Sequence, residues 1–251
     1  MDVTVDQYPY VAGSTFLSSL LPVWMHEGGV EAMLARLDRE EDRRKVVEDL
    51  TNRGRGSEWG WENVLVTSVA TEANKPLEGM TLEDIAKALG KTVFEALFDV
   101  ILEEDNAATM VSFSMSEDDV KTVMGSPLQM VCTDGVVLGK PHPRVYGSFP
   151  RVLGRYVREG ILGLEEAVRK MTSLPAQRFG LHDRGLLRPG MCADITIFNP
   201  DTITDTATYE DPVQYPKGVE YVIVNGKITV ESGEHTGIRA GRVLRHGAHN
   251  G

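Results

Sequence analysis

The chain has 251 residues, enough to bury a sizeable core as one large α/β domain or as two smaller ones. Its 41% hydrophobic and 25% charged residues are typical of an ordinary soluble globular protein. The formal net charge of -11 argues against nucleic acid as a partner, because nucleic-acid-binding proteins usually concentrate Lys and Arg on one face.

Neither the cysteines nor the apolar stretches indicate export or a membrane. Cys132 and Cys192 lie far apart in apolar runs, so we expect free, buried thiols rather than a disulfide. The longest apolar stretch, residues 16–24, is interrupted by serines and a proline and is too short to span a bilayer. No signal peptide is visible at the N-terminus. The sequence therefore predicts a cytoplasmic protein with no membrane partner.

The first 116 residues alternate strand-like and helical patterns. Alternating apolar and polar residues predict strands, and apolar residues at three- and four-residue intervals predict helices. Thr81 begins a sequence resembling a capping box, and Ser116 is a predicted N-cap. The predicted elements are a strand over 3–10, a small-residue loop over 11–15, a helix over 29–50, a loop over 51–60, a strand over 64–69, a helix after Thr81, a helix over 93–104 and a strand over 109–115.

The next stretch carries the residues most suited to chemistry. An apolar run ending at Val131 predicts a buried strand that delivers Asp134 to its exposed end. The proline-rich segment 140–147 predicts a loop that carries Arg144. A strand-end carboxylate followed by such a loop is where α/β enzymes place their chemistry. The alternative is that Asp134 only opens a turn with Gly135.

The remaining residues change in character. Two amphipathic helices precede a turn-rich connection, and Asn225-Gly226 is a strong hairpin turn signal. The basic tail from Ile238 has no pattern, so His246 and His249 are assigned to an exposed tail rather than to a metal site. The predicted elements are helices over 149–159 and 164–173, a connection over 184–190, and strands over 193–200, 219–224 and 227–230.

Several motifs resemble those of one enzyme family, the N-acyl-D-amino-acid deacylases (D-aminoacylases) of the amidohydrolase superfamily. The resemblance covers nearly the whole chain but only the later part of the family. The motifs that carry it are Asp6-Gln7-Tyr8-Pro9-Tyr10, Ala12-Gly13-Ser14-Thr15, Thr133-Asp134-Gly135, His142-Pro143-Arg144-Val145-Tyr146-Gly147 and Met171-Thr172-Ser173-Leu174-Pro175-Ala176.

The resemblance implies an α/β fold that is part of a (β/α)₈, TIM-type, metal-dependent hydrolase barrel. The strand over 3–10 would be the seventh barrel strand and that over 130–134 the eighth, with a large insertion over about 15–115 between them. Residues 1–183 would then form the C-terminal part of the barrel, and residues 184–251 an antiparallel β appendage with a tail.

The resemblance also implies roles for individual residues. Asp134 would touch a zinc ion and act as general acid and base, and Arg144 would bind the free carboxylate of an N-acyl-D-amino acid. Tyr8 and Ser14 would contact the same end of the substrate, and Met115 would line its side-chain pocket. The alternatives are a strand-edge aromatic for Tyr8, a turn former for Ser14 and a core filler for Met115.

The metal ligands expected of the family are largely missing. A zinc site needs three or four protein ligands, and the six histidines form no His-x-His pattern, so Asp134 is the one good candidate. We therefore expect the C-terminal part of a zinc-dependent amidohydrolase that converts N-acyl-D-amino acids to D-amino acids and carboxylates, inactive alone.

Two other interpretations stay open. The chain could be a non-catalytic, stand-alone product that assembles as a homo-oligomer or with a separately encoded N-terminal half, since two barrel strands leave unpaired edges. A narrower alternative is a hydrolase of cyclic amides, like the dihydroorotases and hydantoinases.

Overall fold

The computed structural model describes residues 3–56, 60–137 and 139–245, so His246 and His249 lie outside the described residues. The chain divides into two compact units. The main unit comprises residues 1–10, 116–136 and 142–251, and the inserted unit comprises residues 11–115 and 137–141. Within the described residues, no helix is both long and apolar enough to cross a bilayer.

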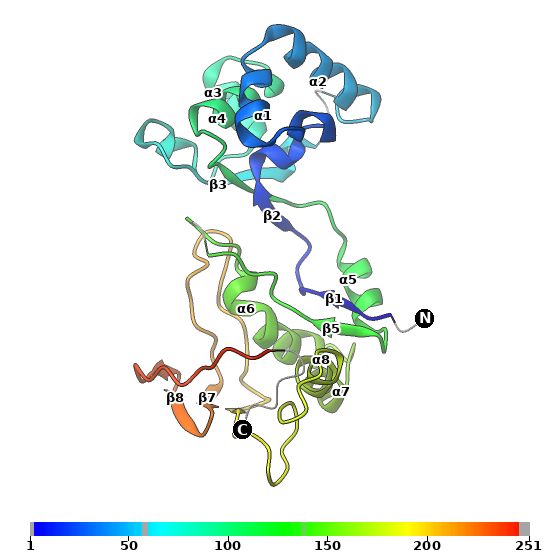
Figure 1. Cartoon of the computed structure of the whole chain (residues 1–251), viewed down its shortest axis with the longest axis vertical. Helices are drawn as coiled ribbons and strands as arrows, with labels where there is room; N and C mark the ends of the chain where they lie inside the picture. Colours follow the sequence, from blue (N-terminus) through cyan, green and yellow to red (C-terminus); the bar gives the residue numbers. More distant parts are fainter. Residues whose placement is uncertain (1–2, 57–59, 138, 246–251) are drawn as a thin grey trace. The chain divides into compact units, whose positions relative to one another are not determined.

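The main unit contains a parallel pair of short strands (Figure 1). Strand β1 (Val5–Gln7) lies beside β5 (Gln129–Val131), with Val5 opposite Gln129. Both strands are shorter than predicted. Helix α5 (Glu117–Met124) precedes β5, and the predicted N-cap Ser116 accepts a hydrogen bond from the backbone N–H of Asp119 (3.1 Å).

Helices follow β5 in the main unit. The segment 140–147 was expected to be a loop, which is wrong, because α6 begins at Arg144. Proline is compatible with the first turn of a helix, where its missing N–H has no partner to lose. The helices are α6 (Arg144–Arg151), the π-helix η5 (Val152–Tyr156), α7 (Leu164–Met171) and α8 (Ser173–Arg178).

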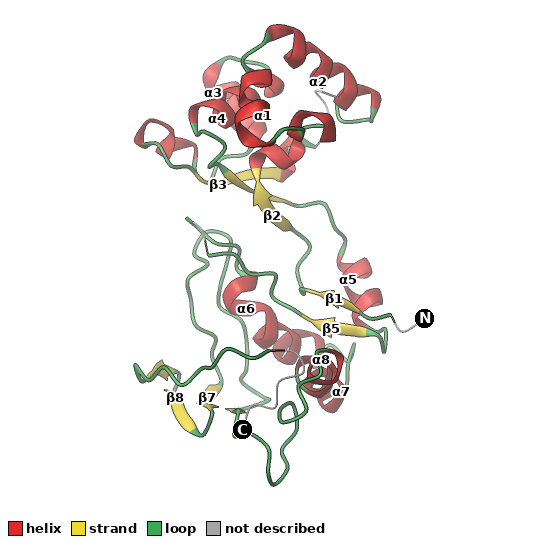
Figure 2. Ribbon diagram, viewed as in Figure 1, coloured by secondary structure: helices red, strands yellow, loops and turns green. Residues whose placement is uncertain are grey.

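An antiparallel sheet of four strands follows the helices of the main unit (Figure 2). The φ angles of Asn225 (48°) and Gly226 (75°) are those of the tight turn that the sequence predicts between β7 and β8. The strand order is β6 (Ile195–Phe198), β7 (Val219–Val224), β8 (Lys227–Glu231) and β9 (Glu234–His235).

The inserted unit packs helices against a second antiparallel sheet, as Figure 1 shows. Its strand order is β2 (Gly13–Phe16), β4 (Thr109–Ser112) and β3 (Val64–Ser68). Residues 11–15 were predicted to be a loop, but Ser14 lies in β2 opposite Val111. The longer helices are α1 (Gly29–Leu37), α2 (Glu40–Asn52), α3 (Leu82–Leu89) and α4 (Val93–Glu103), and the 3₁₀ turns are η1 (Leu17–Leu20), η2 (Val23–His26), η3 (Trp61–Asn63) and η4 (Glu72–Leu77).

Two local details differ from the predictions. The helix expected over 29–50 is divided, because Arg39 is extended (ψ 122°) and a new helix begins at Glu40. The Thr81 side chain caps α3 by accepting from the Asp84 N–H (3.1 Å), but the reciprocal capping box stands at Thr92, before α4. The sequence does not reveal the break at Arg39, because the charged residues around it fit the exposed face of one long helix as well as those of two shorter helices.

A buried carboxylate organises one loop of the inserted unit. Glu104 is 2% exposed and accepts hydrogen bonds from the Thr71 N–H (3.0 Å) and hydroxyl, the Ala70 N–H and the Asn74 amide (2.8 Å). Burial acts to raise the pKa of the Glu104 carboxyl, but these hydrogen bonds outweigh it, and the pKa lies below its usual value.

Glu104→Gln is expected to lower the free energy of unfolding by about 1–3 kcal/mol at neutral pH, since charge-assisted hydrogen bonds are lost. A lowered pKa stabilises the fold above the pKa of the unfolded glutamate, and this stability is lost as the pH falls through the folded value. Denaturant unfolding should therefore show that the free energy of unfolding of the wild type exceeds that of Glu104→Gln at neutral pH, and that this difference shrinks on acidification. Glu83→Gln, in an exposed ion pair, is the control and should change little. A difference in the free energy of unfolding that grows in acid would contradict this role of Glu104.

Candidate active site

Asp134 lies three residues beyond the end of β5. Its φ angle of 44° is in the left-handed region, which is uncommon for residues other than glycine. Its side chain is 61% exposed. Backbone strain of this kind often occurs at functional positions, because the surrounding fold must hold it. The geometry therefore presents a carboxylate at a fixed place beyond a strand end.

Arg144 is the partner of this carboxylate. Its side chain is only 3% exposed, and its Nη2 lies 2.9 Å from Asp134 Oδ2. Its Nε donates to the backbone carbonyl of Asp134 (2.9 Å), and its guanidinium lies over the Tyr8 ring, 4.4 Å from the centroid. The structure thus brings together three of the predicted site residues, one from the β1 end, one from the β5 end and one from the start of α6.

A second layer of aromatic and charged groups lies behind these three residues. His142 is buried against the edges of Tyr10 (5.2 Å) and Tyr209 (5.1 Å). Arg151 stacks over Tyr10 at 4.6 Å and pairs with Asp205 at 2.9 Å. The sequence predictions gave none of these five residues a role of its own. Their place beside the site is revealed only by their contacts in the fold.

Lys170 secures the beginning of the strand that leads to Asp134. Its side chain is 1% exposed, and its Nζ donates to the backbone carbonyls of Gln129 (3.1 Å) and Ser126. Burial lowers the pKa of the Lys170 ammonium group. The ammonium group therefore ties α7 to the first residue of β5.

Burial also changes the acidity of two groups near Asp134. It raises the pKa of the Tyr8 hydroxyl, against the opposing charge of Arg144. It raises the pKa of the Cys132 thiol to about 11, assisted by the charges of Asp6 and Asp134. Cys132 is a free, half-buried thiol, and its raised pKa makes it a poor nucleophile at neutral pH.

The remaining two predicted site residues belong to the inserted unit. Ser14 lies in β2, and Met115 follows β4 with 41% of its surface exposed. The Met115 N–H donates to the carbonyl of Val11 (3.1 Å). Exposure argues against Met115 as a core filler, but the substrate contacts of both residues stay predictions.

The residues present do not form a metal centre. In the described part of the chain, no three His, Cys, Asp or Glu side chains gather closely enough to hold a metal ion. The one predicted ligand, Asp134, is paired with a guanidinium instead. A zinc site of three or four ligands does not fit the described residues.

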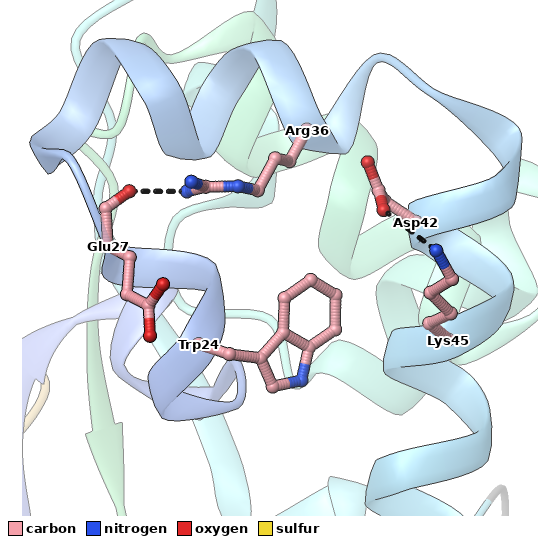
Figure 3. Close-up of a pocket in the computed structure, with 5 residues that line it drawn as sticks. All are labelled: Trp24, Glu27, Arg36, Asp42 and Lys45. Carbon is pink, nitrogen blue, oxygen red and sulfur yellow. Dashed lines mark hydrogen bonds and ion pairs between the residues drawn. The ribbon is translucent and has the colours of Figure 1, made fainter.

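A recess of about 380 Å³ opens elsewhere, in the inserted unit (Figure 3). Figure 3 shows the Trp24 ring below Arg36 and to the left of Lys45, and its Nε1 donates to Asp49. Arg36 Nη1 donates to backbone carbonyls of the preceding turn, and Lys45 lies 3.7 Å from Asp42. Arg36 is thus held by the backbone and Lys45 by an acidic side chain, which is typical of surface polar contacts.

Comparison with known proteins identifies the family. The sequence profile of the amidohydrolase family matches residues 21–230, more than half of the chain. The chain belongs to the amidohydrolase family. The D-aminoacylase of Alcaligenes xylosoxydans xylosoxydans is 36% identical over 248 residues, which are 97% of this chain and 42% of that protein. The N-acyl-D-glutamate deacylase of the same organism is 46% identical over 143 residues, 56% of this chain and 29% of that protein.

Solved structures of amidohydrolases support the same family assignment. A D-aminoacylase crystal structure has a TM-score of 0.73 and 35% identity over 97% of this chain and 43% of that one. The N-acyl-D-glutamate deacylase of Bordetella bronchiseptica, complexed with zinc and a phosphonate inhibitor, has a TM-score of 0.71 and 33% identity over 96% and 42%. These neighbours confirm an α/β, amidohydrolase-type fold. This chain spans less than half the length of the relatives that it matches, a share consistent with the predicted C-terminal portion.

Proposed function

We propose that this amidohydrolase chain supplies part of the active site of an enzyme that hydrolyses N-acyl-D-amino acids. Arg144 binds the free carboxylate of the substrate. Asp134 accepts a proton from the water whose oxygen attacks the amide carbon, and donates it to the nitrogen as the C–N bond breaks. The products are a D-amino acid and a carboxylate.

The observation that carries this proposal is the placement of Arg144. The Tyr8 ring on its face and Asp134 at Nε and Nη2 hold the Arg144 guanidinium in place, and a planar guanidinium matches a carboxylate in parallel charge-assisted hydrogen bonds. Tyr8 supports its face, which gives that residue a role beyond a strand-edge aromatic. Asp134 is one side chain away, so carboxylate binding and proton transfer would occur side by side.

Zinc belongs to this proposal as the metal of the complete site. The zinc-containing structure of the related N-acyl-D-glutamate deacylase supports the choice of metal. Asp134 would be the ligand contributed by this chain, and the other ligands would come from outside the described residues. The isolated chain would consequently be inactive.

The fold suggests how the complete site is assembled. We take β1 and β5, which are parallel neighbours, as the seventh and eighth strands of a TIM-type barrel. The inserted unit lies between them in sequence, corresponding to the insertion over about 15–115, and the β6–β9 sheet is the antiparallel appendage of residues 184–251. Asp134 would then stand at the C-terminal face of the barrel.

A second candidate function, assembly with another polypeptide, rests on a separate observation. A largely apolar cavity of about 870 Å³ lies between α6, α7 and one face of the β6–β8 strands, lined by residues such as Leu153, Val168, Phe198, Val222 and Val230. The described residues also give β1 and β5 no further strand partner. Such surfaces favour association with a second copy or a separately encoded N-terminal half. A monomeric mass in size-exclusion chromatography with light scattering would count against self-assembly.

Hydrolysis of cyclic amides is a weaker alternative. The dihydroorotase of Endomicrobium trichonymphae is 48% identical, but over 48 residues that are 19% of this chain.

An exchange chimera tests the proposed function. In it, this chain replaces the matching 42% of the Alcaligenes D-aminoacylase, so that the relative supplies the rest of the polypeptide. The zinc-loaded chimera should hydrolyse N-acetyl-D-methionine, and the isolated chain should not. A folded chimera without activity, or turnover by the isolated chain, would contradict the proposal.

A further inference from the structure

The backbone of Arg144 is held at both of its polar groups. Its N–H donates to Nδ1 of His142 (2.9 Å), and its carbonyl accepts from the Ser148 hydroxyl (2.7 Å). Pro143 stands at the N-cap of α6, but its backbone is already helical (φ -56°, ψ -18°) and its side chain has no acceptor. His142, one residue earlier, supplies through Nδ1 the acceptor that an N-cap Ser, Thr, Asp or Asn usually provides.

The chemistry of this cap fixes the state of the imidazole. A backbone N–H can only donate, so Nδ1 must carry a lone pair and the ring must be neutral with its proton on Nε2. The ring is 3% exposed and stands perpendicular to both Tyr10 (88°) and Tyr209 (83°). These contacts prevent the ring from turning away from Arg144.

We propose that His142 is the positioning residue for the carboxylate-binding Arg144. It caps the first turn of α6 through Nδ1 and links that turn to Tyr10 and Tyr209. The guanidinium keeps its place over Tyr8 because its backbone cannot move away. This inference rests on the proposed carboxylate-binding role of Arg144, but it makes a separate claim, that a histidine which never touches the substrate determines how well the substrate binds.

Two substitutions separate the cap from simple packing. His142→Phe keeps an aromatic ring between Tyr10 and Tyr209 but removes the acceptor. His142→Asn removes the ring but restores an acceptor that suits an N-cap. In the full chain, we expect His142→Phe to weaken the binding of N-acetyl-D-methionine by about tenfold, the upper part of the range for a lost cap, and His142→Asn to recover most of it. Binding is measured by NMR titration at protein concentrations where each variant is folded.

Two further measurements make the outcomes distinguishable. Arg144→Gln, titrated in parallel, reports on the carboxylate-binding role itself, so unchanged binding by this variant would refute the proposed function rather than the cap. Lower thermal stability of His142→Phe with wild-type binding would overturn the positioning role. If His142→Phe does not fold, the tautomer of the His142 imidazole in the wild-type chain tests the proposal instead. Long-range ¹H–¹⁵N correlations on the wild-type chain should show His142 unprotonated at Nδ1, and a proton on Nδ1 would overturn the proposal.

Discussion

In the exchange chimera, Asp134→Asn should reduce kcat for N-acetyl-D-methionine by about 10²–10⁴-fold, the usual contribution of a general acid or base. The amide keeps the size and shape of the side chain but cannot take up a proton at neutral pH. KM should change less than kcat, because the carboxylate of the substrate is bound by Arg144 rather than by Asp134. Steady-state kinetics measures both quantities.

The control for this substitution is Asp119→Asn, which alters an aspartate at the start of α5. Its exposed side chain accepts a hydrogen bond from the Ser116 hydroxyl (2.7 Å) and lies outside the candidate site, so kcat should be unchanged. If Asp134→Asn retains near-wild-type kcat, Asp134 does not transfer the proton, and the turn-forming interpretation of Asp134 and Gly135 would be favoured.

Arg144→Gln is expected to have the second largest effect, this time on substrate binding. Removing one partner of a buried, hydrogen-bonded charge pair costs about 2–5 kcal/mol, so KM in the chimera should rise by at least about 30-fold. Arg144→Lys retains the charge but not the planar fork, and should recover only part of the loss. An unchanged KM for Arg144→Gln would show that the carboxylate is bound by another group.

The sequence predicts the regular parts of the fold because their signals are local. The helix over 93–104 and the hairpin around Asn225-Gly226 follow from periodicity and turn chemistry, and both are present. The segment 140–147 is wrongly predicted because two prolines conceal the start of a helix, and the cap that stabilises it is a histidine, a residue outside the usual N-cap set.

The candidate site is predictable only in part, because some of its residues come together only through contacts between distant parts of the sequence. Asp134, Arg144 and Tyr8 belong to recognisable motifs, and the structure brings them together. The supporting residues Asp205 and Tyr209 carry no motif. They reach His142 and Arg151 across more than fifty positions of sequence, and only packing reveals such pairs.

The central claim is that Arg144 recognises the free carboxylate of an N-acyl-D-amino acid. Titration of the ¹⁵N-labelled chain with N-acetyl-D-methionine, and separately with its primary amide, tests it most directly, with the Arg144 Nε–H signal as the probe. The acid should shift this signal in a saturable manner, and the amide should not, because it lacks the carboxylate. Equal shifts from both compounds, or no shift from the acid, would contradict the account.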